Sequence, residues 1–254
     1  MASALRSCLR TATLNGIRQR WFDSARTAAE RDRPVVLFLH GWPESWFCWR
    51  HQLEAVHAAG FRGIAPDMRG YGGTDKPQSY TSYNAYTLAG DMLALLQHIG
   101  AEEAALVGHD HGANLGWKLA LLHPAVFPMY CALSVPWSGR PAAPPIEHMR
   151  KKFGDERLPA ADQRFNYQLH QQMPGSAAQF DCDPRRALLA IMGPGQGEHA
   201  PPPVPSAKLW VDGVAEPNWR RLPQPAEPPA WLPPADFDYL VSTYEGGFEG
   251  GLNW

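Results

Sequence analysis

The sequence contains no long hydrophobic run, no paired cysteines and no strong excess of either charge. No apolar run approaches the roughly 18 residues that a membrane-spanning helix needs. The four cysteines are scattered without a CxxC pattern, which favours free thiols in a reducing compartment over a disulfide framework or a zinc site. A formal net charge of −2 over 254 residues gives no electrostatic reason to expect nucleic acid or an anionic membrane as a partner. We therefore expect a soluble, cytoplasmic protein.

The amino-terminal segment contains four arginines and no acidic residue before Asp23. An organelle transit peptide has this composition. However, Asn15-Gly16-Ile17 resembles a turn between two short strands, which favours a folded hairpin over a targeting signal.

Short apolar runs alternate with helical patterns through the first half of the chain. The expected strands are residues 34–40, 61–65, 104–108 and 130–135, and the expected helices are residues 49–59, 83–99 and 112–123. This alternation predicts an α/β fold with a doubly wound, mostly parallel sheet. Ligands bind such sheets beyond the carboxyl ends of the strands. Four residues follow strand ends and should therefore share one rim: His40, Asp67, Asp110 and Pro136.

The composition changes after Pro136. Residues 138–235 are rich in proline, glutamine and arginine, and helical patterns remain at 163–172, 184–191 and 236–245. No strand pattern returns. We expect residues 1–137 to form the α/β core and residues 138–254 to form a mostly helical insertion.

The segment Gly108-His109-Asp110-His111-Gly112 lies between an expected strand and an expected helix. It has the form of a nucleophile elbow, G-x-S-x-G, with aspartate in place of serine. The apex of an elbow is strained, and glycines on both sides avoid a clash across the turn. Two histidines around an aspartate also suggest metal ligands, but neighbouring side chains point in different directions and no further ligand cluster lies at suitable spacing. We expect an elbow with no metal and no cofactor.

The turn His40-Gly41-Trp42-Pro43 follows the first buried strand. A turn in this position can direct a backbone N–H at a developing oxyanion, together with the N–H of the residue after the nucleophile. The expected oxyanion donors are therefore the backbone groups of Trp42 and His111.

Several motifs, in order and at typical spacing, resemble the epoxide hydrolase branch of the α/β-hydrolase superfamily. They are HGWPESW (40–46), WRHQ (49–52), DMRGYG (67–72), GHDHGA (108–113), YQL (167–169), QMPG (172–175) and GFEGGLNW (247–254). The resemblance implies an α/β-hydrolase core and a helical cap in residues 138–254. It also implies that Asp110 is the nucleophile and that Tyr167 hydrogen-bonds the epoxide oxygen. The expected substrate pocket includes His40, Pro43, Trp137 and Gln168.

The implied chemistry has two steps, and its partners are a small apolar epoxide and water. An aspartate is ionised at neutral pH, so Asp110 needs no base to attack an epoxide carbon. The departing alkoxide needs a proton, which tyrosine hydroxyls can donate. The resulting ester is then hydrolysed by a water activated by a histidine.

The chain departs from the family pattern at three places. His111 stands where the family often has tryptophan, and Met173 stands where it usually has glutamate. In the family, the triad acid and histidine follow the cap. In this chain, all ten histidines lie at or before His199, and the two late aspartates, Asp236 and Asp238, fall in an expected cap helix. We therefore expect a truncated core that starts the reaction without completing it, and an uncovered strand at 130–135 through which copies self-associate.

Two alternatives remain open at this stage. A haloalkane or haloacid dehalogenase of the same fold also attacks carbon with an elbow aspartate, but it needs halide-binding donors, and Tyr167 before Gln168 favours the epoxide. A non-catalytic, vestigial hydrolase is favoured by the early stop.

Overall fold

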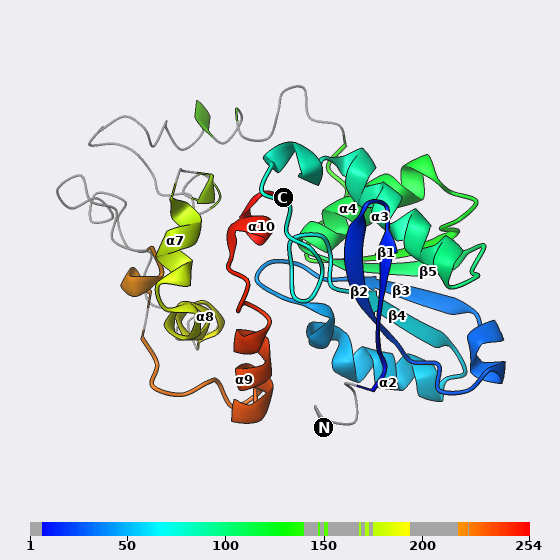
Figure 1. Cartoon of the computed structure of the whole chain (residues 1–254), viewed down its shortest axis with the longest axis horizontal. Helices are drawn as coiled ribbons and strands as arrows, with labels where there is room; N and C mark the ends of the chain where they lie inside the picture. The colour runs from blue at the N-terminus through cyan, green and yellow to red at the C-terminus, as the bar shows by residue number, and fades with distance from the viewer. Residues whose placement is uncertain are drawn as a thin grey trace. The chain divides into compact units, whose positions relative to one another are not determined.

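The computed structural model describes residues 7–139, 147, 150–151, 168, 171–172, 175–193, 218–222 and 224–254. The chain divides into two compact units, shown in Figure 1. The first comprises Met1–Trp137 with Asn253–Trp254, and the second comprises Ser138–Leu252. The last two residues thus belong to the first unit. The assignment of the second unit as a cap stays a prediction.

The first unit contains a six-stranded sheet with the order β1-β2-β4-β3-β5-β6. The strands are β1 (Leu9–Leu14), β2 (Ile17–Asp23), β3 (Val35–Leu39), β4 (Arg62–Pro66), β5 (Ala104–His109) and β6 (Met129–Leu133). The β1–β2 and β2–β4 pairs are antiparallel, and the other three pairs are parallel. This confirms the predicted doubly wound, mostly parallel α/β fold. The chain leaves β3 towards β4 on one side and later returns to β5 on the other, so the ends of β3 and β5 form a topological switch point.

The amino-terminal hairpin turns at Asn15 and Gly16. Both residues have positive φ, 48° and 77°, as a type I′ turn requires. The Asn15 side chain donates to Asp91 at 2.7 Å and to the Thr87 carbonyl at 3.1 Å. The expected turn between two short strands is therefore confirmed, and the turn is fastened to a helix of the core.

Helices cover both faces of the sheet in the first unit. They are η1 (Ala29–Asp32), η2 (Trp46–Trp49), α2 (Arg50–Ala58), η3 (Tyr80–Tyr83), α3 (Ala85–His98) and α4 (His111–Leu122). Figure 1 shows α2 on one face and α3 with α4 on the other. Along β3, Leu37 and Leu39 pack in the cluster formed with α3 and α4, while Phe38 contacts Trp49 next to α2. Both sets are buried, which explains the continuous apolar run of this strand.

Two helix starts differ from expectation for local reasons. The expected helix 49–59 is preceded by the 3-10 turn η2, where the Ser45 side chain accepts from Phe47 N. The expected helix 83–99 begins only at Ala85. The Asn84 side chain accepts from the N–H groups of Tyr86 and Thr87 and so caps it.

In the described residues of the second unit, every regular element is a helix. Its elements are α7 (Ser176–Asp181), α8 (Pro184–Met192), η6 (Asn218–Arg221), α9 (Pro234–Ser242) and α10 (Glu249–Leu252). Phe248 stacks on Phe180 and Tyr244, with ring centroids 5.3 and 4.0 Å apart. The predicted helix 236–245 lies two to three residues earlier in the structure. The predicted helix 163–172 falls almost wholly outside the described residues.

Candidate active site

Asp110 lies at the sharp turn between β5 and α4. Its backbone has φ 52° and ψ −117°, a conformation that non-glycine residues rarely adopt. The flanking glycines permit the turn. A Cβ added at Gly108 would lie 2.6 Å from the Gly112 carbonyl oxygen, and one added at Gly112 would lie 2.6 Å from the His40 carbonyl oxygen. The elbow geometry thus depends on close backbone approaches that larger residues would prevent.

The turn after β3 reaches the Asp110 carboxylate. The Trp42 N–H donates to Asp110 Oδ1 at 3.1 Å. Gly41 makes this approach possible, because a Cβ there would lie 2.5 Å from the Asp110 Cβ. One carboxylate oxygen is therefore held by a backbone donor. The Asp110 side chain is 31% exposed, so the carboxylate remains accessible.

His111 begins α4, and N–H groups in the first turn of a helix have no intrahelical acceptor. Its ring also faces the site: Nε2 lies 4.0 Å from Asp110 Oδ1, and Nδ1 lies 3.5 Å from the Tyr71 hydroxyl. The ring is nearly parallel to that of Trp254 at 6.0 Å. Burial lowers the pKa of His111, against an opposing effect of the Asp110 charge. At neutral pH the imidazole is therefore neutral.

His109 points to a different partner. Its Nδ1 lies 3.1 Å from Glu44 Oε2, and the same oxygen accepts from the Gly41 N–H at 2.9 Å. The two histidines around Asp110 thus contact Glu44 and Tyr71 respectively, and they do not converge on a common point. This arrangement argues against the metal-ligand reading of the motif.

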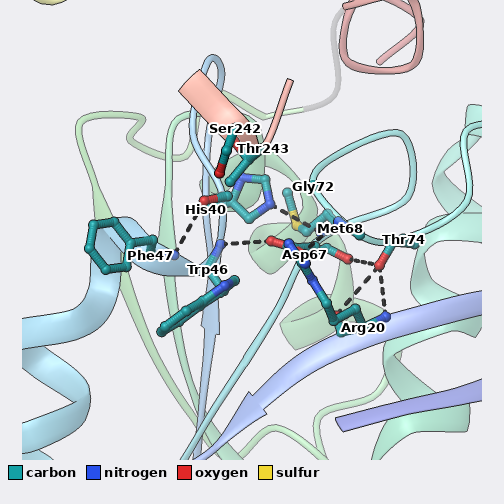
Figure 2. Close-up of polar contacts among 12 residues, drawn as sticks. Arg20, His40, Trp46, Phe47, Asp67, Met68, Gly72, Thr74, Ser242 and Thr243 are labelled. Carbon is teal, nitrogen blue, oxygen red and sulfur yellow. Dashed lines mark hydrogen bonds and ion pairs between the residues drawn. The ribbon is translucent and has the colours of Figure 1, made fainter. Parts of the chain in front are cut away.

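His40 and Asp67 tie the ends of β3 and β4 together, as Figure 2 shows. His40 is fully buried. Its Nε2 accepts from the Met68 N–H at 3.0 Å and its Nδ1 lies 2.9 Å from the Gly41 carbonyl, so the proton is on Nδ1. Burial lowers the pKa of His40, which keeps the ring neutral. With both nitrogens engaged, His40 offers no polar atom to the expected substrate.

Asp67 is equally engaged. It accepts from Arg20 Nε at 2.6 Å, from the Trp46 N–H at 3.1 Å and from the Gly73 N–H at 3.0 Å. The buried carboxylate therefore fixes the loop after β4 rather than standing free at the rim.

The remaining pocket predictions have varied environments. Trp137 is 50% exposed and packs against Trp117, while Pro43 is buried. Trp46, three residues after Pro43 in the sequence, is 1% exposed and stacks on Phe22. It belongs to the core. Gln168 is half-buried in the second unit. Tyr167 and Met173 lie outside the described residues.

Sequence reasoning missed the contacts of Glu44 and Tyr71 with the residues beside the nucleophile. Glu44 stands three residues after Gly41, as the last residue of a four-residue turn does, and at this spacing its side chain can accept from the first N–H of the turn. The Glu44 contact was therefore predictable from the local sequence. Tyr71 contacts His111 across 40 residues, and no local pattern indicates that contact.

The site and sheet agree with comparisons to known proteins. A family model described as the α/β hydrolase fold matches residues 34–165. Epoxide hydrolase A of Mycobacterium tuberculosis is 37% identical over 252 residues, covering 96% of this chain and 72% of the relative. Epoxide hydrolase 3 of Siraitia grosvenorii is 39% identical over 223 residues, covering 87% of this chain and 65% of the relative.

Solved structures give the same answer. The crystal structure of epoxide hydrolase A from Mycobacterium thermoresistibile has a TM-score of 0.82 at 35% identity, over 97% of this chain and 73% of that one. Fold and elbow thus define an α/β hydrolase. Within that class, the chain belongs to the epoxide hydrolase family, and the resemblance seen in its motifs is confirmed.

None of the helices in the described part of the chain has the length and apolar character needed to cross a bilayer.

Proposed function

We propose that this protein hydrolyses epoxides to diols and that Asp110 is the nucleophile. The observation that carries the proposal is the placement of Asp110. It is a partly exposed carboxylate at a strained strand-to-helix turn, with Oδ1 held by the Trp42 N–H at 3.1 Å. This contact leaves Oδ2 available to attack carbon.

In the first step, Asp110 Oδ2 forms a bond to an epoxide carbon and the carbon–oxygen bond of the ring breaks. The electron pair goes to the epoxide oxygen, which takes a proton from a tyrosine hydroxyl. The family resemblance assigns that donor to Tyr167. The product of this step is an ester between Asp110 and the opened substrate.

In the second step, water attacks the ester carbon of Asp110 and its proton passes to a base. Negative charge then develops on Oδ1, where the Trp42 N–H already lies, and the first-turn N–H of His111 is the second proposed donor. Collapse of this oxyanion breaks the ester bond, and the leaving alkoxide takes up the proton held by the base, which releases the diol; loss of the proton of the new carboxylic acid restores the carboxylate. Because Oδ1 carries more charge here than in the resting carboxylate, the donors favour this step.

The test is intact-mass analysis of the chain after incubation with a small apolar epoxide. We expect a mass increase of one epoxide, mapped to Asp110 by peptide digestion, or diol formed in its place. The Asp110→Asn variant, which keeps the shape of the side chain, should give neither. The proposal fails if the unaltered chain gives neither adduct nor diol, or if the variant reacts as fast. Chloride release from a chloroalkane in a parallel sample would favour a dehalogenase instead.

We also propose that copies of this chain associate through β6. The support is an apolar strand face next to an edge: Met129 is 64% exposed, Leu133 is 41% exposed and Cys131 between them is exposed. In the described residues β6 pairs only with β5, so its other edge can pair with the same edge of a second copy. Light scattering over a range of concentrations should show association, and Leu133→Lys should reduce it. A monomer at all concentrations would contradict the proposal.

A further inference from the structure

Glu44 lies between the two loops that form the proposed site. Its Oε2 accepts from the Gly41 N–H at 2.9 Å and lies 3.1 Å from His109 Nδ1. Gly41 immediately precedes Trp42, whose N–H contacts the nucleophile, and His109 immediately precedes Asp110. Glu44 Oε2 therefore links Gly41, next to the proposed oxyanion donor, to His109, next to the proposed nucleophile.

The carboxylate of Glu44 is largely enclosed by donors. Its side chain is 20% exposed. Burial acts to raise the pKa of Glu44, but the hydrogen bond and charge of His109, with the Gly41 N–H, hold it below its usual range. The pKa of His109 is raised in turn by its hydrogen bond to Glu44. The Cys48 thiol also hydrogen-bonds this carboxylate, and burial with the Glu44 charge raises the pKa of the thiol. Three donors thus converge on one ionised group.

The turn that Glu44 closes is short. The Glu44 N–H donates to the Gly41 carbonyl at 3.1 Å, while the Glu44 side chain accepts from the Gly41 N–H. Trp42 lies inside this ring of contacts. The direction of its N–H is consequently fixed from both ends of the turn, and the link to His109 fixes the turn against β5.

We infer that Glu44 is a positioning residue for the hydrolytic half of the reaction, an inference that rests on the proposed function. The reason is where charge develops. In the first step, negative charge leaves Asp110 for the epoxide oxygen. In the second step, charge develops on Asp110 Oδ1, which the Trp42 N–H faces. Loss of the Glu44 carboxylate frees the turn and therefore slows the second step more than the first.

The experiment measures the two steps separately on the full chain. Styrene oxide is added, formation of the Asp110 ester is followed by intact mass, and excess epoxide is then removed to follow loss of the ester. For Glu44→Ala we expect the ester half-life to be about tenfold longer, an effect smaller than that of deleting an oxyanion donor outright. We expect the rate of Asp110 alkylation to change less than about threefold. Glu44→Gln keeps an acceptor oxygen and should restore most of the half-life.

Two further variants are measured beside Glu44→Ala, one as a control and one that breaks the other link to Glu44. Glu54→Ala removes an exposed glutamate of α2, and it should change neither step. His109→Phe removes one link to Glu44 but leaves the bond within the turn, and it should lengthen the half-life in the same direction even where Glu44→Ala does not fold.

The outcomes separate the two claims. If the unaltered chain forms neither ester nor diol, the proposed function fails before any variant is compared. If the ester forms but Glu44→Ala and His109→Phe leave its half-life unchanged, the positioning role is overturned. The same holds if the two variants slow both steps equally and also lower the melting temperature.

Discussion

Gly112→Ala tests how closely the elbow and the first strand must approach. A Cβ at this position would meet the backbone carbonyl of Leu39 and would lie 2.6 Å from the carbonyl oxygen of His40. Ordinary carbon–oxygen contacts begin near 3.3 Å, so the start of α4 must move by at least about 0.7 Å. Because both obstacles are backbone atoms, no side chain can rotate to relieve the contact. We expect a loss of about 3 kcal/mol in the free energy of unfolding, at the upper end for an overpacked site.

The same displacement separates Asp110 from the turn that holds it, because the obstructing carbonyls immediately precede Gly41. Misplacement of about 1 Å in a catalytic arrangement can cost about 100-fold, so we expect Asp110 alkylation to slow by roughly 10- to 100-fold. For a chain of this size, the stability loss corresponds to a melting temperature lower by about 6–12 °C.

The matched control is Gly100→Ala. Gly100 has φ 75° and nothing within 4 Å of an added Cβ, so alanine there meets only backbone strain of about 1–2 kcal/mol. Thermal unfolding and intact-mass kinetics would be measured on both variants. The reasoning would be refuted if Gly112→Ala matched Gly100→Ala in stability and kept the alkylation rate of the unaltered chain.

Four more predictions concern a buried ion pair and three histidines near the proposed site. Asp23→Ala removes the bidentate partner of the buried Arg62, and urea denaturation should show a loss of about 3–5 kcal/mol; a loss below about 1 kcal/mol would contradict this. Burial lowers the pKa of His40 and of His111 below the ordinary value near 6.5, so the unfolded chain binds more protons and stability should fall as the pH drops through about 6.5. The pKa of His109 is raised, so this residue stabilises the fold below about pH 6.5 and loses that effect at higher pH. In urea titrations, His109→Phe should therefore make the free energy of unfolding fall more steeply as the pH drops. An unchanged or shallower pH dependence would count against this assignment. His111→Phe removes the ring nitrogen that lies 4.0 Å from Asp110 Oδ1, and we expect the ester half-life to lengthen about threefold. An unchanged half-life would restrict His111 to its backbone role.

The fold was predictable because its signals are local. Asn15-Gly16 marks a hairpin by the positive φ that both positions adopt, and the run 35–39 is apolar because both faces of β3 are covered. Gly108 marks the elbow for a steric reason that acts within five residues, whereas the space at Gly112 is limited by the backbone carbonyls of Leu39 and His40, which are distant in the sequence. Element ends were less accurate, since a side-chain cap such as Asn84 moves a helix start without changing its periodicity.

The site was predictable only in part. The elbow and the turn at Trp42 follow from spacing, but their mutual contact depends on sheet order, which places β3 beside β5. His40 was expected in the pocket because it follows a strand. Its bonds to Met68 and Gly41 link strand ends, which position alone does not reveal, and its place in the pocket stays a prediction. Tertiary hydrogen bonds of this kind have no signature in local sequence.

The hairpin turn at Asn15 has a practical consequence for engineering the protein. Asn15 binds Asp91, and Asp91 binds Arg69 through two hydrogen bonds of 2.8 and 2.7 Å. The Arg69 carbonyl in turn accepts from the Trp254 indole at 2.7 Å, and the Trp254 ring stacks on His111. A chain of direct contacts thus runs from the amino-terminal turn to the residue beside the nucleophile. Tags and fusions belong before residue 9, because trimming into the hairpin would remove the first link of that chain.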